Sequence, residues 1–255
     1  MAPIEIHIDS RDRSSGTNTD FETDLRPELQ GMTLGLKTAQ IPFSFYIFNA
    51  TNNIVDFSEG GGALTATITP GTYSSATFVA ELKTRLDGAG ALTYTVTVSG
   101  TTGLVTIAAT GAFELLWGTG VNAATSPATL LGFAAADLTL AATYTSTGVA
   151  MLTGADGNVF IRLQGVTSGA PRGAFSYQKP SAIASTPLGS SNVFAVVPID
   201  VAPFEVIVYA PEVTMFKLAA GAQIDALRIQ LTDKAGTPLD LHGVPWSMTF
   251  IADGP

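Results

Sequence analysis

DALRIQLTDKAGTPLDLHGVPWSMTFIA, residues 225–252, contains two segments in which every second residue is apolar. The apolar positions are 227, 229 and 231 in the first segment and 246, 248 and 250 in the second. Because successive side chains of a β-strand point to opposite faces, each segment predicts a strand that is buried on one side. The Asp-Lys-Ala-Gly segment at 233–236 predicts a turn. The chain therefore ends in half-buried antiparallel β-structure, and this stretch contains no catalytic motif.

The composition predicts neutral surfaces. Hydrophobic residues make up 46% of the 255 residues and charged residues only 13%, about half of the roughly 25% that is usual for globular domains. Thr, Ser, Gly and Ala stand where Lys and Glu are common, so we expect outward faces that desolvate easily against other subunits. The net charge of −9, with no basic cluster beyond Arg11 and Arg13, argues against direct binding of nucleic acid.

The sequence contains no recognisable set of catalytic or ligand-binding residues. It has no cysteine and two histidines, His7 and His242, neither of which has a partner at metal-ligand spacing. It has no Gly-x-Ser-x-Gly motif, no marked carboxylate pair, no run of 18 apolar residues and no secretory signal at its start. We therefore expect no enzymatic activity, no catalytic residues, no metal, no cofactor and no transmembrane segment.

Changes in the spacing of apolar residues divide the chain into three parts. They are an N-terminal arm (1–30), a β-framework (31–61 and 146–255) and an inserted α+β subdomain (62–145). In the arm, a short strand precedes apolar residues at the helix-like spacing 21, 25 and 29. In the framework, the parity of the apolar residues changes between Leu36 and Ala39, which predicts a β-bulge. The aromatic run 43–48 predicts a strand that is buried in the core.

The inserted subdomain contains the one helix that we predict. Ser74 or Ser75 is the expected N-cap, Glu81 and Arg85 have the spacing of an ion pair, and Gly88 marks the end. A hairpin of residues 94–98 and 104–108 follows the helix. The apolar face of the helix consists of Phe78, Val79, Leu82 and Leu86.

Short motifs occur in order over almost the whole chain. They are IDSRDR at 8–13 with DF at 20–21, IPFSFYIFN at 41–49, ITPGTYSSATFVAELKTRL at 68–86, LLGF at 130–133 and LDLHGVPWSMTFI at 239–251. In this order they resemble the single jelly-roll penton and minor capsid proteins of large eukaryotic DNA viruses and virophages.

This resemblance implies an all-β-dominated fold: an antiparallel jelly-roll sandwich with an inserted α+β subdomain carrying one helix. It also implies a structural protein of the virion capsid that is assembled in the infected host cell. The interpretation we favour is the penton, a homopentamer at the icosahedral vertex, with copies of itself and neighbouring major and minor capsid proteins as partners.

Three alternatives remain at this stage. The first is another minor capsid protein. The second is a fibre or adhesin-type module that binds a glycan or a receptor, for which Trp117 and Trp246 are candidate stacking platforms, although both tryptophans also suit a core. The third is a hydrolase on the same fold, which requires a carboxylate pair that the sequence does not show.

We expect the residues that contact other subunits to come from three segments. These are the polar part of the arm, the Gly/Pro/Ser-rich loop 165–191, and the outward side of the last two strands. The candidates are Asp9, Arg11, Asp12, Arg13, Arg172, Tyr177, Lys179, Arg228, Gln230 and Thr249.

A charge introduced at Thr249 tests this expectation. In Thr249→Glu the new carboxylate lies on the outward side of the last strand, so folding is retained while a desolvated contact with a neighbour is weakened. Circular dichroism reports the fold and mass photometry reports the assembly. Unchanged assembly of the folded variant contradicts the expectation.

Overall fold

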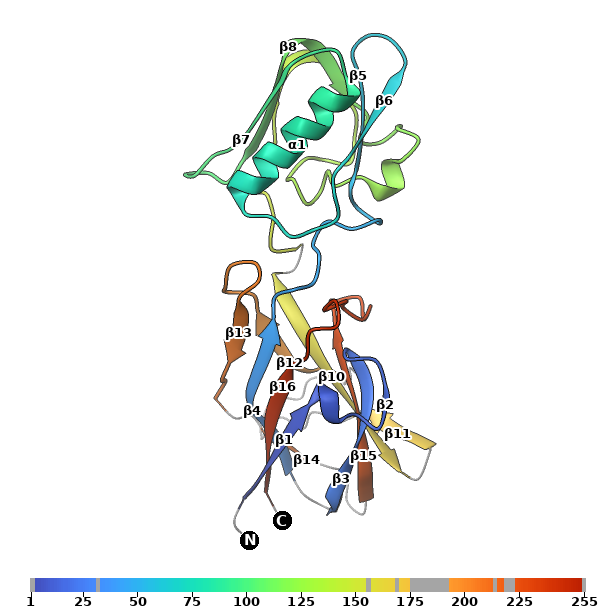
Figure 1. The fold of residues 1–255 in the computed structure, drawn as a ribbon, viewed down its shortest axis with the longest axis vertical. Coiled ribbons are helices and arrows are strands. Elements are labelled where there is room, and N and C mark those ends of the chain that lie inside the picture. Colours follow the sequence, from blue (N-terminus) through green and yellow to red (C-terminus); the bar gives the residue numbers. More distant parts are fainter. Residues whose placement is uncertain are drawn as a thin grey trace, which may run out of the picture. The chain divides into compact units, whose positions relative to one another are not determined.

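The structure is a computed structural model, in which the chain folds into two compact units (Figure 1). The framework unit comprises residues 1–44 and 158–255, and the inserted unit comprises residues 45–157. The described residues are 3–30, 33–154, 157–167, 170–174, 193–212, 215–217 and 223–253.

The framework unit consists of two antiparallel sheets. Sheet A has the strand order β1 (Ile4–Asp9), β16 (Ser247–Asp253), β4 (Thr33–Pro42) and β13 (Val206–Tyr209), and β14 (Met215–Lys217) also pairs with β4. Sheet B has the order β11 (Ala170–Ala174), β10 (Asn158–Thr167), β15 (Gln223–Thr232), β3 (Asp20–Gln30) and β2 (Ser15–Gly16), and β12 (Val193–Pro198) also pairs with β10.

The two strands of the C-terminal stretch belong to different sheets. β15 pairs with β3 and β10 in sheet B, whereas β16 pairs with β1 and β4 in sheet A. Their apolar positions are all buried in the core: Leu227, Ile229, Leu231, Trp246, Met248 and Phe250. The predicted alternation and the antiparallel sandwich are therefore confirmed, with the two strands as its opposite layers and not as a hairpin.

Residues 4–30, predicted as an arm, contribute strands to both sheets. β1 pairs with β16 in sheet A, and β3 pairs with β15 in sheet B. The helix-like spacing of residues 21, 25 and 29 does not correspond to a helix, because these residues lie in strand β3. Phe21, Thr23 and Leu25 are buried with period two, since Phe21 lies opposite Ile229 in the register with β15. Three apolar residues at helix-like spacing are too few to determine a helix, and pairing within the sheet makes this segment a strand.

The predicted bulge in β4 is confirmed, but the predicted strand at 43–48 is wrong. Thr249 of β16 lies opposite Thr38 while the next residue, Phe250, lies opposite Leu36, so Lys37 is the extra residue. The strand ends at Pro42, which has no backbone N–H to continue a ladder. The aromatic run beyond it is not a strand, although Phe43, Phe45, Ile47 and Phe48 are buried.

The predicted loop 165–191 is in part a pair of strands. β10 extends to Thr167 and pairs with β11, with a register shift between Gln164 and Gly165. Residues 175–192 lie outside the described part of the chain.

The inserted unit has a third antiparallel sheet and the helix α1 (Ser75–Ala89). The strand order is β6 (Ala63–Thr67), β5 (Ile54–Ser58), β8 (Val105–Leu115) and β7 (Tyr94–Val98), and β9 (Leu138–Thr145) also pairs with β8. A short 3₁₀ helix, η2 (Ala123–Thr125), precedes β9. α1 crosses one face of this sheet and packs on β6 and β7 (Figure 1). The hairpin predicted at 94–108 is the pair β7 and β8.

The predicted helix is confirmed, with a different end. The Ser74 hydroxyl accepts a hydrogen bond from the Thr77 amide, and Arg85 Nε lies 2.8 Å from Glu81 Oε1. The helix passes through Gly88 and ends at Ala89, and the N–H of the capping residue Gly90 donates to the Leu86 carbonyl. The buried side of the helix consists of Phe78, Leu82 and Leu86.

The inserted unit begins before the predicted boundary at residue 62 and ends after residue 145. Aromatic packing gives the reason at the first boundary. The ring of Phe48, in the predicted framework segment 31–61, stacks on Phe78 of α1 with centroids 5.1 Å apart and packs edge-on against Tyr73. The residues after Pro42 thus complete the core of the helix-bearing unit.

Truncation of Phe78 tests this core. Phe78→Ala removes a fully buried ring, so the free energy of unfolding is expected to fall by about 3–5 kcal/mol. Phe204→Ala is the matched control, because Phe204 is 73% exposed and its truncation is expected to cost less than about 0.5 kcal/mol. Urea denaturation followed by circular dichroism measures both, and equal losses contradict the assignment of this core.

Candidate subunit interface

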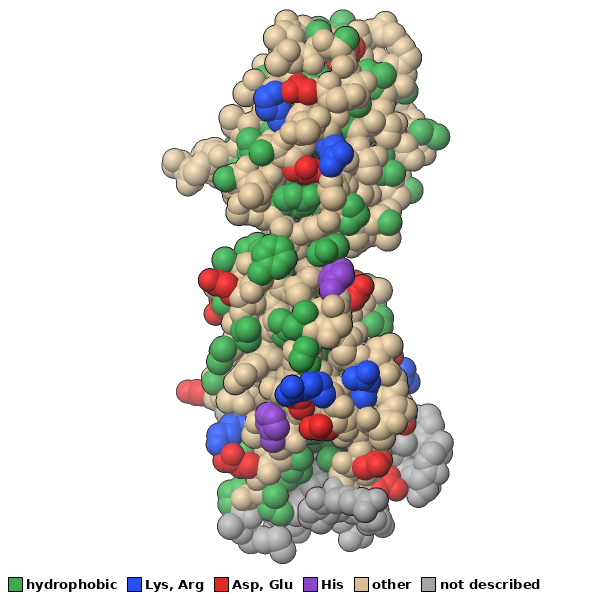
Figure 2. Space-filling view, in the orientation of Figure 1, with side chains coloured by type: hydrophobic (Ala, Val, Ile, Leu, Met, Phe, Trp, Pro, Cys, Tyr) green, Lys and Arg blue, Asp and Glu red, His purple; other side chains and the backbone are tan. Residues whose placement is uncertain are grey.

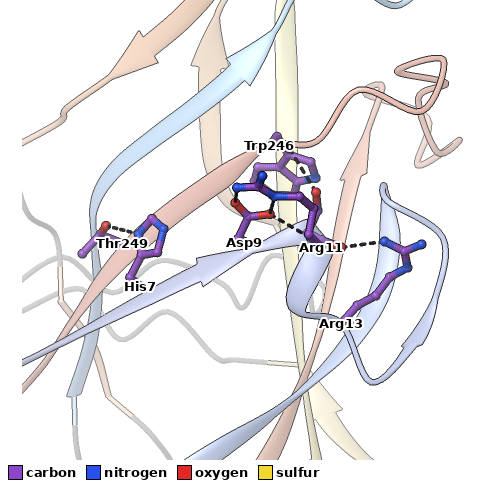
Figure 3. Close-up of polar contacts among 7 residues, drawn as sticks. His7, Asp9, Arg11, Arg13, Trp246 and Thr249 are labelled. Carbon is purple, nitrogen blue, oxygen red and sulfur yellow. Dashed lines mark hydrogen bonds and ion pairs between the residues drawn. The ribbon is translucent and has the colours of Figure 1, made fainter.

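The motif IDSRDR folds into a compact structure between β1 and β3 that we call the N-terminal clip, residues 9–13 (Figure 3). Asp9 precedes the 3₁₀ helix η1 (Ser10–Asp12) and accepts a hydrogen bond from the Arg11 amide at 2.8 Å. Arg11 also donates Nε and Nη2 to the two Asp9 oxygens at 2.9 and 2.7 Å. These side-chain hydrogen bonds from Arg11 hold the pKa of Asp9 below its usual range.

Ser10 joins the clip to the start of β16. Its backbone N–H donates to the Trp246 carbonyl at 2.9 Å, and its hydroxyl accepts from the Trp246 amide at 3.0 Å. The Trp246 indole donates to the Asn18 carbonyl at 2.7 Å and packs edge-on against Phe21. Most of the IDSRDR motif is therefore explained by contacts within the chain.

Arg13 differs from Arg11 because it forms no ion pair with a described residue. Its Nη1 donates to the Ser10 carbonyl at 2.7 Å and its Nε to the Gly16 carbonyl at 3.2 Å. Gly16 has φ +90°, and a Cβ there would lie 2.2 Å from the Asp20 carbonyl oxygen, so this turn requires glycine. The turn fixes the position of an exposed guanidinium whose charge no described carboxylate neutralises.

Arg228 and Gln230, two more candidates, are bound to Asp20. Arg228 donates Nε and Nη2 to the two Asp20 oxygens at 2.8 Å each, and Gln230 donates Nε2 to Oδ2 at 3.1 Å. The Arg228 hydrogen bonds hold the pKa of Asp20 below its usual range. These side chains link β3 to β15 on the outer face of sheet B.

Thr249 lies on the outer face of sheet A, where it contacts His7. Its hydroxyl and the His7 Nδ1 are 3.2 Å apart, and the two residues are opposite each other in the register of β1 and β16. From there the same face continues through Thr38, Gln40 and Pro42 of β4 to Val206 and Val208 of β13. The named residues of this band are uncharged, while the same face of β1 carries Glu5, which is paired with Lys37, and Asp9, which is paired with Arg11.

The end of this band is apolar, and we call it the β13 surface: Phe204, Val206 and Val208. The three side chains are 73%, 49% and 64% exposed, whereas Ile207 between them is buried. Figure 2 shows hydrophobic side chains over β13, and Lys and Arg side chains over the clip. Exposed apolar groups that are adjacent mark contact surfaces in soluble proteins.

The backbone at Phe204 is strained. Its φ is +71°, a conformation that costs a bulky residue about 1–3 kcal/mol. Hydrogen bonds from both sides enforce it: the Phe204 N–H donates to the Phe43 carbonyl at 3.0 Å, and the Phe43 N–H donates to the Glu205 carbonyl at 2.8 Å. Strain that holds an apolar ring in solvent indicates a use for that ring.

The structure says little about the remaining predicted contact residues. Asp12 is exposed on η1. Arg172 lies in β11, a strand whose side chains are not described, and Tyr177 and Lys179 lie outside the described residues. The sequence does not predict the β13 surface, because the run 204–209 is almost wholly apolar. Without alternation of apolar and polar residues, the sequence does not show which side chains of the strand face outward.

In the described part of the chain, no three residues among His, Asp and Glu are grouped to hold a metal ion, and no helix is long and apolar enough to cross a membrane. Trp117 and Trp246 are 1% and 3% exposed. They belong to the core and cannot serve as stacking platforms for a glycan.

The comparisons with known proteins found solved structures that align with this chain over almost its whole length. The mavirus penton protein aligns over 100% of both chains with a TM-score of 0.53 and 8% identity. A chain of the Sputnik virophage structure aligns over 99% of this chain and 97% of its own, with a TM-score of 0.45 and 11% identity. No family model and no curated protein sequence match. The mavirus alignment confirms the jelly-roll fold with its inserted subdomain.

Asp20→Asn tests the polar link between β3 and β15. Removing the charge that Arg228 binds is expected to lower the free energy of unfolding by about 1 kcal/mol at neutral pH, since the pair is partly exposed. Because the folded pKa of Asp20 is lowered, the wild-type advantage is present above about pH 4 and is lost as the pH falls through the folded pKa.

Asp12→Asn is the matched control, because Asp12 is exposed on η1 and its change is expected to stay within about 0.5 kcal/mol. Urea denaturation at a series of pH values measures both variants. The same pH dependence in both would show that the link to Arg228 contributes nothing.

Proposed function

We propose that this chain is a penton protein, a non-enzymatic structural protein that assembles as a homopentamer at the vertices of an icosahedral virus capsid. The observation that carries the proposal is the fold shared with the mavirus penton protein over the full length of both chains. Since the alignment includes the inserted unit as well as the sandwich, it supports the whole architecture of that protein.

The surface of the framework unit supports the same proposal. The outer face of sheet A has an uncharged band that ends in exposed apolar side chains. Neutral and apolar groups lose little hydration when another subunit covers them. In a closed ring, each subunit offers two different faces to its neighbours, and the capsid around the ring supplies the neighbouring major and minor capsid proteins as further partners.

The proposal places the protein in the virion, after assembly in the infected host cell. It assigns the candidates Asp9, Arg11, Asp12, Arg13, Arg228, Gln230 and Thr249 to the neighbourhood of subunit contacts, with Asp9, Arg228 and Gln230 also serving the fold.

Mass photometry of the purified chain tests the proposal. With a chain mass of 26.3 kDa, a closed ring of five copies gives about 130 kDa, and negative-stain images are expected to show fivefold particles. A monomer at all accessible concentrations, or a trimer, overturns the pentameric penton. A trimer would favour a fibre-like protein.

A further inference from the structure

The two ends of sheet A differ in chemical character. β1 is the last strand at one end, where the clip leads the chain across to sheet B. β13 is the last strand at the other end, where residues 199–205 bring the chain back from β12 of sheet B. A subunit of this kind therefore has two lateral ends, each formed by an edge strand and a crossing loop.

The β13 end combines apolar and acidic side chains. Phe204, Val206 and Val208 are exposed. The described residues 193–212 contain three carboxylates and no lysine or arginine, and Lys217 of β14 lies further along the same edge of β4. None of the three carboxylates forms an ion pair with a described residue, although Glu205 Oε2 accepts a hydrogen bond from the Ala202 amide at 2.9 Å. The three carboxylates are Asp200, Glu205 and Glu212.

The clip end offers a cation instead. The clip itself is neutral, since it contains Asp9 and Asp12 as well as Arg11 and Arg13. Arg11 is neutralised by Asp9, whereas Arg13 is fixed by two backbone carbonyls and has no described carboxylate partner. An ordered guanidinium of this kind binds a carboxylate with little loss of side-chain freedom.

We propose that the β13 surface of one copy, with Glu205 beside it, docks against the Arg13 clip of the next copy. This inference rests on the proposed function, because it requires that the chain assembles with itself. Charge complementarity selects a second copy as the occupant, since one end of the chain supplies carboxylates and the other a guanidinium, none of which forms an ion pair with a described residue. A contact between two different surfaces is heterologous and closes a ring by rotation.

Two variants each disable one end. Val206→Asp/Val208→Asp places charge on the β13 surface, and Arg13→Glu reverses the charge of the clip. Each variant alone is expected to assemble roughly 100-fold more weakly than the wild type. Arg13→Glu sets a carboxylate against Glu205, and the two aspartates replace apolar contacts with charged groups that lose their hydration on docking. Arg13→Gln removes the charge and retains a single donor nitrogen on a shorter side chain, so it disturbs the clip less than the charge reversal does.

Val121→Asp is the matched control for the valine variants. Val121 is 88% exposed in the inserted unit, so the same substitution there is expected to leave assembly unchanged. Circular dichroism and thermal unfolding of all variants show that each one is folded before assembly is compared.

Mixing the two disabled variants gives the decisive measurement. The valine variant retains an intact clip and Arg13→Glu retains an intact β13 surface, so together they form one productive contact. The expected product is a 1:1 dimer of about 53 kDa that cannot grow into a ring. Mass photometry detects it, and differently tagged copies establish that it contains one of each.

Each other outcome overturns the inference in a recognisable way. If the wild type forms pentamers and the variants do so equally well, the contact lies elsewhere and the proposed function stands. If each variant alone is monomeric and the mixture remains monomeric, the two surfaces do not bind each other. If the wild type itself never assembles, both the inference and the proposed function fail.

Discussion

Aromatic packing between the two sheets, Trp246 against Phe21 and Phe250 against Phe194, is the interaction on which the framework unit depends. Backbone hydrogen bonds hold each sheet together but do not join two stacked sheets, so a sandwich is stabilised by side chains between its layers. Trp246 stands at the start of β16 in sheet A, and its ring lies 6.1 Å from that of Phe21 in sheet B. The Ser10 N–H donates to the Trp246 carbonyl, the Ser10 hydroxyl accepts from the Trp246 amide, and the Asn18 carbonyl accepts from the indole. These hydrogen bonds fix the first crossing of the chain from one sheet to the other.

This constraint determines what is left for contacts with other subunits. The motif residues that look most available in the sequence have partners within the chain: Asp9 binds Arg11, and Asp20 binds Arg228. An ion pair that is already satisfied contributes little to a new interface, because docking would have to desolvate it again. The groups that gain from a neighbour are those without such partners, namely Arg13 and the apolar side chains of the β13 surface.

The sequence predicted the parts of the fold that local pattern decides. The helix with its Ser74 cap, the bulge between Leu36 and Ala39 and the strands of residues 225–252 follow from periodicity and turn chemistry over a few residues. Pairing between distant segments was not predictable in this way. Nothing near residues 225–252 shows that its two strands enter opposite sheets, and nothing near Phe48 shows that its ring stacks on Phe78. The β13 surface was missed for a related reason, since burial of Ile207 and exposure of its two valine neighbours depend on the pairing with β4.

The positions of the two candidate contact surfaces follow from the path of the chain. A strand that is paired on both sides has little freedom in its backbone. A loop that crosses between sheets at an edge does not have to form the regular hydrogen bonds of strand pairing. The chain makes such a crossing through η1 at one end of sheet A and through residues 199–205 at the other. The first crossing carries the capped turn that holds Arg13, and the second carries the left-handed backbone that holds Phe204 in solvent. Because the two crossings lie at opposite ends of the same sheet, surfaces of different chemistry face in different directions on each copy. A subunit with this arrangement is suited to contacts that run head to tail.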